Sequence, residues 1–123
     1  MKDGHKDLGR EGEEVALRDY LKRDYRLVER NWSVRQGEID LIVRKGDTLV
    51  FVEVKTSDDH SPFHPLENVT LRKQKKLSLL IELYLSMDPP SSKIRQMRCD
   101  AAQVIRDDSG TYSVTIVPNI LED

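Results

Sequence analysis

Three charged residues, Asp40, Glu53 and Lys55, occupy apolar segments of this chain in which charged side chains are unexpected. The two segments, residues 37–43 and 50–55, are rich in β-branched and large apolar residues and are typical of strands. Charged side chains on such strands are rarely buried unless they are paired or bind a metal. The pattern therefore singles out these three residues as candidates for chemistry.

The short segment between the two strands predicts how these charges are placed. Positions 46–47 are a Gly-Asp pair, which is typical of a two-residue hairpin turn. The register that this turn predicts places Asp40 directly opposite Glu53, with the two Cβ atoms roughly 5 Å apart. Lys55 follows Glu53 by two positions and therefore points to the same face. We expect two carboxylates and one ammonium group to converge.

Such a trio is suited to metal-dependent hydrolysis of a phosphodiester. Magnesium prefers oxygen ligands, and it usually takes one or two protein carboxylates and leaves sites for water and substrate phosphate. The cation lowers the pKa of bound water and neutralises charge that builds on the phosphodiester. A nearby lysine can hold or deprotonate the attacking water, or stabilise the developing charge. The alternative, which composition alone favours, is a cross-strand ion pair on a solvated face.

Other parts of the chain shift this balance toward chemistry. The relevant residues are Gly9-Arg10-Glu11-Gly12-Glu13, Asn31, Gly37-Glu38-Ile39-Asp40-Leu41-Ile42, Val50-Phe51-Val52-Glu53-Val54-Lys55 and Arg98-Cys99-Asp100. Together they resemble the Asp…Glu-x-Lys core of the restriction-endonuclease-like nuclease superfamily. More closely, the chain resembles the uncharacterised bacterial YraN-type family, relatives of the archaeal Holliday-junction resolvases. The resemblance covers nearly the whole chain in the expected order.

This resemblance implies a metal-dependent nuclease that acts on DNA, with a preference for branched or distorted structures. Magnesium or manganese would be held by Asp40 and Glu53, with the Val54 carbonyl as a third ligand. Lys55 would orient or activate water, and Glu13 would assist as a further acid. The related resolvases act as two-fold dimers, which implies a homodimer here as well.

Glu13 has two readings from the sequence itself. It borders the apolar face of a predicted helix and can point inward toward the sheet. It can equally be a first-turn glutamate that complements the helix dipole. Gly9 and Gly12, which precede it, permit close approach to the substrate backbone or mark a flexible helix entry.

The net charge of −2 gives no general attraction to nucleic acid, so a binding surface must come from local clusters. One cluster lies at the start of the second predicted helix and comprises Arg72, Lys73, Gln74, Lys75 and Lys76. We expect the nucleic-acid contacts at Arg72, Lys73, Gln74 and Lys76. The resemblance implies that Lys73 or Gln74 leans toward the scissile phosphate. The alternative is an ordinary solvated helix start.

Hydrophobic periodicity predicts helices over residues 11–23 and 70–86 and strands over residues 25–32, 37–43, 49–56, 95–106 and 111–118. The expected fold class is α/β, a restriction-endonuclease-like mixed sheet flanked by helices in the order αβββαββ. Four residues form the apolar face of the first helix: Ala16, Leu17, Tyr20 and Leu21. The corresponding face of the second helix consists of Leu77, Leu80, Ile81, Tyr84 and Leu85. Arg98 and Asp100 are expected to form a structural ion pair.

Residues 57–68 are polar and interrupted by proline, and we expect a mobile loop at the rim of the site. His60 and His64 lie in it, but no cysteine or second histidine pair completes a zinc site. With 123 residues, the chain is expected to be a single domain over residues 1–123. A single Cys99, no apolar run of roughly 20 residues and no hydrophobic signal segment favour a cytoplasmic location.

Two functions from different classes remain open. The first is a metal-dependent nuclease that cuts DNA by direct attack of water. The second is a catalytically silent module, on the same fold, that binds nucleic acid or another protein. The intact set of Asp40, Glu53 and Lys55 favours the first, because a silent module has no chemical need for all three. A purely structural ion-pair cluster would bind no divalent metal.

Overall fold

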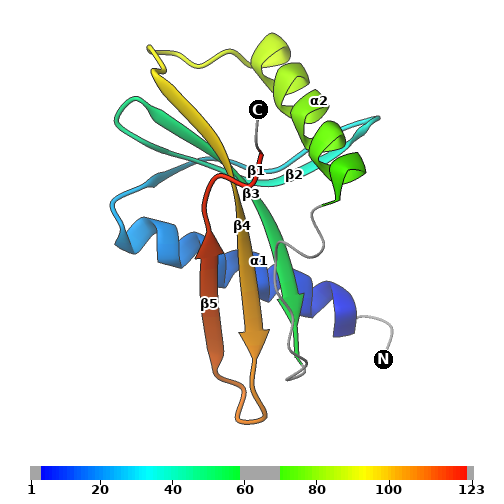
Figure 1. Ribbon diagram of the computed structural model, residues 1–123. Coiled ribbons are helices and arrows are strands. Elements are labelled where there is room, and N and C mark those ends of the chain that lie inside the picture. Colours follow the sequence, from blue (N-terminus) through cyan, green and yellow to red (C-terminus); the bar gives the residue numbers. More distant parts are fainter. Residues whose placement is uncertain (1–3, 59–69, 122–123) are drawn as a thin grey trace.

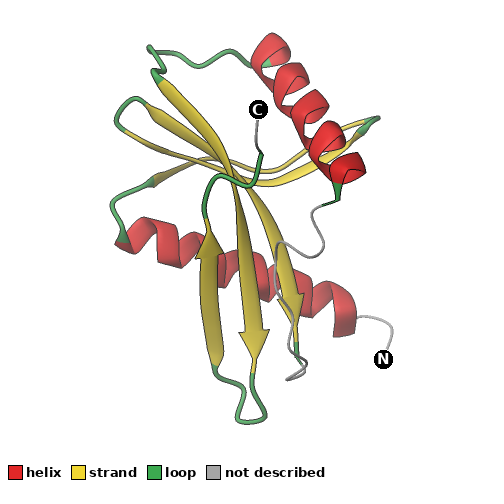
Figure 2. Cartoon of the chain, in the orientation of Figure 1, coloured by secondary structure: helices red, strands yellow, loops and turns green. Residues whose placement is uncertain are grey.

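The computed structural model describes residues 4–58 and 70–121, in which two helices and a five-stranded mixed sheet follow the predicted order αβββαββ (Figures 1 and 2). The elements are α1 (Gly4–Lys22), β1 (Arg26–Val34), β2 (Gly37–Lys45), β3 (Thr48–Ser57), α2 (Leu71–Met87), β4 (Gln96–Arg106) and β5 (Tyr112–Val117). Most of the loop predicted at 57–68, with both of its histidines, lies outside the described residues.

The strands lie in sequence order across the sheet, β1-β2-β3-β4-β5. Three of the four neighbouring pairs are antiparallel, and β3 pairs with β4 in parallel. A parallel pair needs a crossover, and α2 lies in that connection. The β2–β3 hairpin has the predicted register, from Lys45 opposite Thr48 to Leu41 opposite Val52. Gly46 adopts a φ of +59° in the turn, a conformation that glycine reaches without steric cost.

The two helices cover opposite faces of the sheet, and each buries its own apolar cluster. Under α1 lie Leu41, Val43, Val50, Val52, Ala102 and Val104, together with Ala16, Leu17 and Tyr20 of the helix. Under α2 lie Trp32, Ile39, Ile42, Leu49, Phe51, Cys99, Ala101 and Ile120, together with Leu77, Leu80 and Tyr84 of the helix. The predicted apolar faces pack against the sheet, with Ile81 and Leu85 of α2 only partly buried, and one assigned residue lies outside the packed face. Leu21 is 46% exposed, so its assignment to the packed face of α1 was wrong.

Helix α1 begins well before the predicted start at residue 11, and this changes the roles of two glycines. Gly9 and Gly12 lie inside the helix, so neither marks its entry. A Cβ atom on Gly12 would overlap the Thr56 side chain, whereas a Cβ on Gly9 would meet nothing within 4 Å. Gly12 thus allows close approach of α1 to β3 of the same chain.

A buried polar network joins α1 to β4 beneath the sheet. The Asp100 carboxylate is fully buried and accepts hydrogen bonds from the Tyr20 hydroxyl at 2.7 Å and from Nε of Arg98 at 3.0 Å. It also accepts one from the backbone N–H of Asn119 at 3.0 Å. The predicted ion pair of Arg98 and Asp100 is confirmed, and its charge is satisfied by partners on three segments.

No helix in the described part of the chain is both long and apolar enough to cross a membrane.

Candidate metal centre

Strands β2 and β3 separate at one end of their ladder, and Asp40 occupies the position where they part. The last paired residues are Leu41 and Val52. One position further, Oδ2 of Asp40 accepts a hydrogen bond from the backbone N–H of Val54 at 2.8 Å. A side chain thus replaces a backbone carbonyl as acceptor, so the strands separate without leaving this donor unsatisfied.

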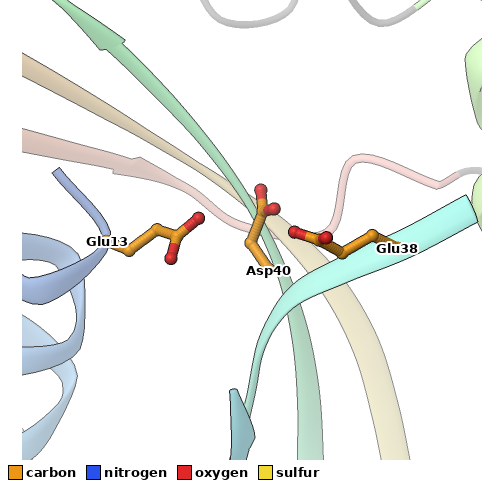
Figure 3. A group of neighbouring side chains, drawn as sticks. All are labelled: Glu13, Glu38 and Asp40. Carbon is orange, nitrogen blue, oxygen red and sulfur yellow. The ribbon is translucent and has the colours of Figure 1, made fainter. Parts of the chain in front are cut away.

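Asn31 lies between Arg30 and Trp32, which pair with Leu41 and Ile39 on either side of Asp40, and it has an unusual backbone. Its φ of +54° is in the left-handed region, which asparagine tolerates better than most residues. The alternation of faces along β2 breaks at the same level, since Ile39 packs beneath α2 and Leu41 beneath α1. At this kink the Asp40 carboxylate lies between the side chains of Glu13 of α1 and Glu38 of β2 (Figure 3).

Three carboxylates meet at this point. Glu13 of α1, and Glu38 and Asp40 of β2, each place one oxygen within 4.8 Å of the other two (Figure 3). The Asn31 amide lies among them. Oriented to face the acids, its nitrogen donates to Oε1 of Glu13 at 3.1 Å and to Oε2 of Glu38 at 3.2 Å. This orientation is assigned from the hydrogen-bond network, because the opposite one would set oxygen against oxygen.

One arginine lies beside the cluster on the α1 side. Nε of Arg30 is 3.8 Å from Oε1 of Glu13, and Nη1 of Arg30 donates a hydrogen bond to Oε1 of Glu14 at 2.9 Å. The Glu13 side chain is only 15% exposed, so it points inward, which was one of its two predicted placements. Arg30 thus offsets part of the acidic charge and holds Glu13 against β1.

The negative charge of the cluster is only partly balanced by Arg30, and the pKa values of Asp40 and Glu13 are both raised. The pKa of Asp40 is raised to about 7, first by burial and then by the carboxylates of Glu53, Glu13 and Glu38, while the Val54 N–H opposes the shift. Burial also raises the pKa of Glu13, against the lowering effects of Asn31 and Arg30. A divalent cation would relieve this repulsion, and the donors are the oxygens that magnesium and manganese prefer.

Cationic groups approach the same carboxylates from the α2 side. The Lys73 ammonium lies within hydrogen-bonding reach of Lys55 and in the field of Glu53 and Asp40. Burial lowers the pKa of Lys73, and the neighbouring Lys55 lowers it further. The first turn of α2 therefore reaches the predicted site.

The predicted catalytic residues take two kinds of position, either inside the carboxylate cluster or around it. Asp40 and Glu13 come together, and Glu53, Lys55 and Lys73 interact around them. Glu53 is outside the tight carboxylate set among the described residues, and Glu38 takes that place. The Val54 N–H donates to Asp40, and the Val54 carbonyl stays a predicted metal ligand.

The predicted nucleic-acid contacts on α2 do not share one face. The Lys76 side chain lies against Gly37 at the turn between β1 and β2, and Arg72 is exposed. Gln74 lines a groove on the outer side of α2, beside Leu71 and Leu79.

Sequence reasoning did not select Glu38 and Asn31 as site residues. Alternation along a strand gives a signal for Glu38, since it lies two positions before Asp40 and shares its face. The signal for Asn31 is weaker. Asparagine adopts the left-handed backbone conformation more readily than most residues, but its presence in a strand does not by itself predict that conformation.

Comparisons with known proteins place the chain in a family. The model of the uncharacterised protein family UPF0102 matches residues 12–104. A UPF0102 protein of Clavibacter michiganensis is 42% identical over 111 residues, covering 90% of this chain and 92% of the relative. One from Dictyoglomus thermophilum is 37% identical over 106 residues, with 86% and 88% covered. Another, from Chloroflexus aurantiacus, is 50% identical over 80 residues, with 64% and 63% covered. The matched residues include every member of the carboxylate cluster, and the chain belongs to the UPF0102 family.

Proposed function

We propose that this protein is a divalent-metal-dependent nuclease that hydrolyses DNA phosphodiester bonds with magnesium or manganese. The observation that carries the proposal is the Asp40 carboxylate, which is partly buried among other acids on one side and faces lysines on the other. Acidic oxygens suit a hard cation, and ammonium groups suit the phosphate that the cation would share. A structural ion-pair cluster would not need so many carboxylates together.

Asp40 and Glu53, with Glu13 and Glu38 beside them, would hold the metal. When bound, the metal would lower the pKa of a water ligand and neutralise charge on the reacting phosphate. The Val54 N–H fixes the orientation of the Asp40 carboxylate. The Asn31 amide holds Glu13 and Glu38 at ligand spacing, so the acids are in place before a metal arrives.

Lys55 orients the attacking water or stabilises the negative charge that develops on the phosphate. Lys73 lies beside it and supplies a second positive charge from a different element. Two ammonium groups in contact repel each other, and a phosphate between them would remove this repulsion. The lysine pair therefore supports an anionic substrate at this side of Asp40.

DNA would approach along the first turns of α2. Arg72, Lys73 and Lys76 carry charge there, and no acidic residue occupies the first turn. Thr70 caps the helix by accepting a hydrogen bond from the Lys73 N–H. The positive end of the helix dipole adds to the attraction for phosphate. Branched or distorted DNA is the proposed substrate because of the resemblance to junction resolvases.

The test is cleavage of single-stranded, duplex, flapped and four-way DNA in magnesium or manganese. Wild type is expected to cut, with branched DNA preferred, and Asp40→Asn is expected to be inactive. The matched control is Asp47→Asn, in the β2–β3 turn at the far end of the hairpin, which should cut like wild type. A wild type that binds DNA and cuts none of these substrates would favour the silent module instead.

Metal binding can be measured separately by calorimetric titration of manganese. We expect weak binding by wild type and by Asp47→Asn, and loss of most binding in Asp40→Asn. Asparagine is nearly isosteric with aspartate and keeps an oxygen acceptor for the Val54 N–H, so the fold should persist. Unchanged manganese affinity in Asp40→Asn would remove Asp40 from the metal site.

A further inference from the structure

Among the described residues, one side of helix α2 packs against no other element, and this side carries exposed apolar residues. Leu71 is 66% exposed and Leu79 is 44% exposed. Lys75, Ser78 and Glu82 are exposed on the same side of the helix. Single exposed leucines are ordinary, but two beside a groove on one helix indicate a contact surface.

The outer side of α2 is hollowed where it meets the end of the chain. A groove of about 300 Å³ runs along it, lined by Leu71, Gln74, Lys75, Ser78, Leu79, Glu82 and Leu121. A larger hollow of about 720 Å³ adjoins it at Ser78, Glu82 and Leu121, and its further lining includes Ile81, Leu85 and Met97. Met97 is itself 52% exposed. The surface therefore combines projecting leucines with hollows that could receive them.

Four exposed residues and the half-buried Leu85, which also borders the core under α2, have the spacing of a helix that packs against another helix. Leu71, Lys75, Ser78, Glu82 and Leu85 follow one another at intervals of four, three, four and three residues, and such a seam can face a partner helix along its whole length. The small Ser78 lies at the centre of this seam, where a short side chain lets two helix backbones approach closely.

The charges on the seam are complementary to those of an antiparallel copy of itself. Lys75 lies three residues before Ser78 and Glu82 four residues after it, so antiparallel pairing about Ser78 brings the lysine of each copy near the glutamate of the other. Within the part of the chain that the structure describes, neither Lys75 nor Glu82 has an ion-pair partner. A parallel copy would instead set lysine against lysine.

We propose that this side of α2 binds the same side of a second copy of the chain, antiparallel and about a two-fold axis at Ser78. Leu71 of one copy then lies next to Leu85 of the other, beside the larger hollow. Two ion pairs between Lys75 and Glu82 flank the axis. A two-fold contact is self-complementary, so each residue of the seam is used twice.

This contact leaves the candidate metal centre open. Lys73 lies two residues after Leu71, about half a helical turn away, so it faces Lys55 and is not part of the seam. Association through α2 requires neither bound metal nor catalytic activity, so it can be tested without them. If the protein also cleaves DNA, the dimer carries two metal centres, one on each side of the paired α2 helices.

Sedimentation equilibrium in a metal chelator tests the proposal by charge exchange. Wild type is expected to form dimers. Lys75→Glu and Glu82→Lys each set like charges against each other twice, and each should raise the dimer Kd on the order of tenfold or more. The double variant Lys75→Glu/Glu82→Lys restores opposite charges and should restore the dimer. The matched control, Lys93→Glu, alters an exposed lysine outside α2 and should leave the Kd unchanged. A wild type that stays monomeric at high concentration would overturn the proposal, as would a double variant no better than the singles.

Cross-linking locates the axis independently of charge. Ser78→Cys should be joined rapidly into a covalent dimer by a short thiol cross-linker, because both copies place this residue at the axis. The native Cys99 is buried, so the wild-type chain should not cross-link and serves as the negative control. A cysteine at exposed Lys22, near the end of α1, is the control and should cross-link slowly. Equal rates for Ser78→Cys and Lys22→Cys would place the interface elsewhere.

Discussion

The Asp40 carboxylate accepts a hydrogen bond from the Val54 backbone N–H at 2.8 Å, at the point where β2 leaves β3. This contact ties the central acid of the cluster to the residue between Glu53 and Lys55. The three positions that the sequence singles out are therefore held together by the backbone of β3. The side chain that would bind the metal is also the one that lets the strands part.

Asp40→Asn should stabilise the metal-free protein at alkaline pH and have little effect at acidic pH. The Asp40 pKa is raised from its ordinary value of 3.8 to about 7. Its contribution to stability is therefore fully present below pH 3.8 and is lost as the pH rises through 7. At pH 8 the ionised carboxylate is repelled by Glu13, Glu38 and Glu53, and asparagine removes this repulsion.

The gain should be on the order of 2 kcal/mol at pH 8, measured by urea unfolding in a chelator. At pH 5 the folded carboxyl is protonated but the unfolded one is already ionised, so the gain should be smaller than at pH 8, and it should vanish only below pH 3.8. A variant that is less stable than wild type at pH 8 would show that the acids do not strain the fold.

Gly12→Ala and Gly9→Ala should have opposite effects, although both lie within α1. Alanine at position 9 meets no atom within 4 Å and should stabilise the helix by about 0.5–1 kcal/mol. Alanine at position 12 overlaps Thr56 and must push α1 away from β3, which should cost about 1–3 kcal/mol. Thermal unfolding of the two variants measures both effects, and equal effects would contradict the close packing at Gly12.

The sequence predicted the elements and the hairpin register because both follow from local patterns. The Gly-Asp turn defined the pairing from Lys45 and Thr48 as far as Leu41 and Val52. The pattern stops predicting at Asp40, because strict alternation assumes an unbroken strand. Asn31, with its φ of +54°, breaks this assumption from the neighbouring strand, which periodicity within one segment does not reveal. Glu53, on the neighbouring strand, lies outside the tight carboxylate set, whereas Glu38, two positions before Asp40 on the same strand, belongs to it.

Asn31→Gly should be more stable than Asn31→Ala, the reverse of the usual order in a strand. Glycine in a strand interior is normally less stable than alanine by roughly 0.5–1 kcal/mol. Position 31 adopts a φ of +54°. In this conformation a Cβ atom lowers the stability of the fold by roughly 1–2 kcal/mol, whereas glycine has no such steric penalty. Both variants lose the amide that contacts Glu13 and Glu38, so the comparison isolates the backbone. Chemical unfolding with alanine as the more stable variant would exclude the left-handed conformation.

Tyr20→Phe should destabilise the fold by about 1.5–3 kcal/mol, because it removes a buried hydrogen bond to a charged group. The Tyr20 hydroxyl donates to Asp100, whose carboxylate is fully buried and would lose one of its partners. Tyr112→Phe is the matched control, since its hydroxyl contacts Glu11 at the surface. Urea unfolding should show a much smaller loss for that control. Equal losses would mean that the buried network contributes little.

Lys55→Ala should abolish DNA cleavage and leave DNA binding nearly unchanged. Removing an electrostatic stabiliser from such a site typically costs on the order of 100-fold or more in rate. Binding depends on many phosphate contacts, of which this variant removes one. The double variant Lys73→Ala/Lys76→Ala should mainly weaken binding and flatten its dependence on salt, because it removes two charges from the start of α2.

Lys93→Ala, an exposed lysine just before β4, is the control for both variants. The measurements are manganese-dependent cleavage of four-way DNA and binding to the same DNA in a chelator at several salt concentrations. Because Lys55 and Lys73 are in contact, removing one also changes the field at the other, and the two variants should not be fully independent. Lys55→Ala that cuts as fast as wild type would end the catalytic assignment. Lys73→Ala/Lys76→Ala with unaltered binding would move the DNA path away from α2.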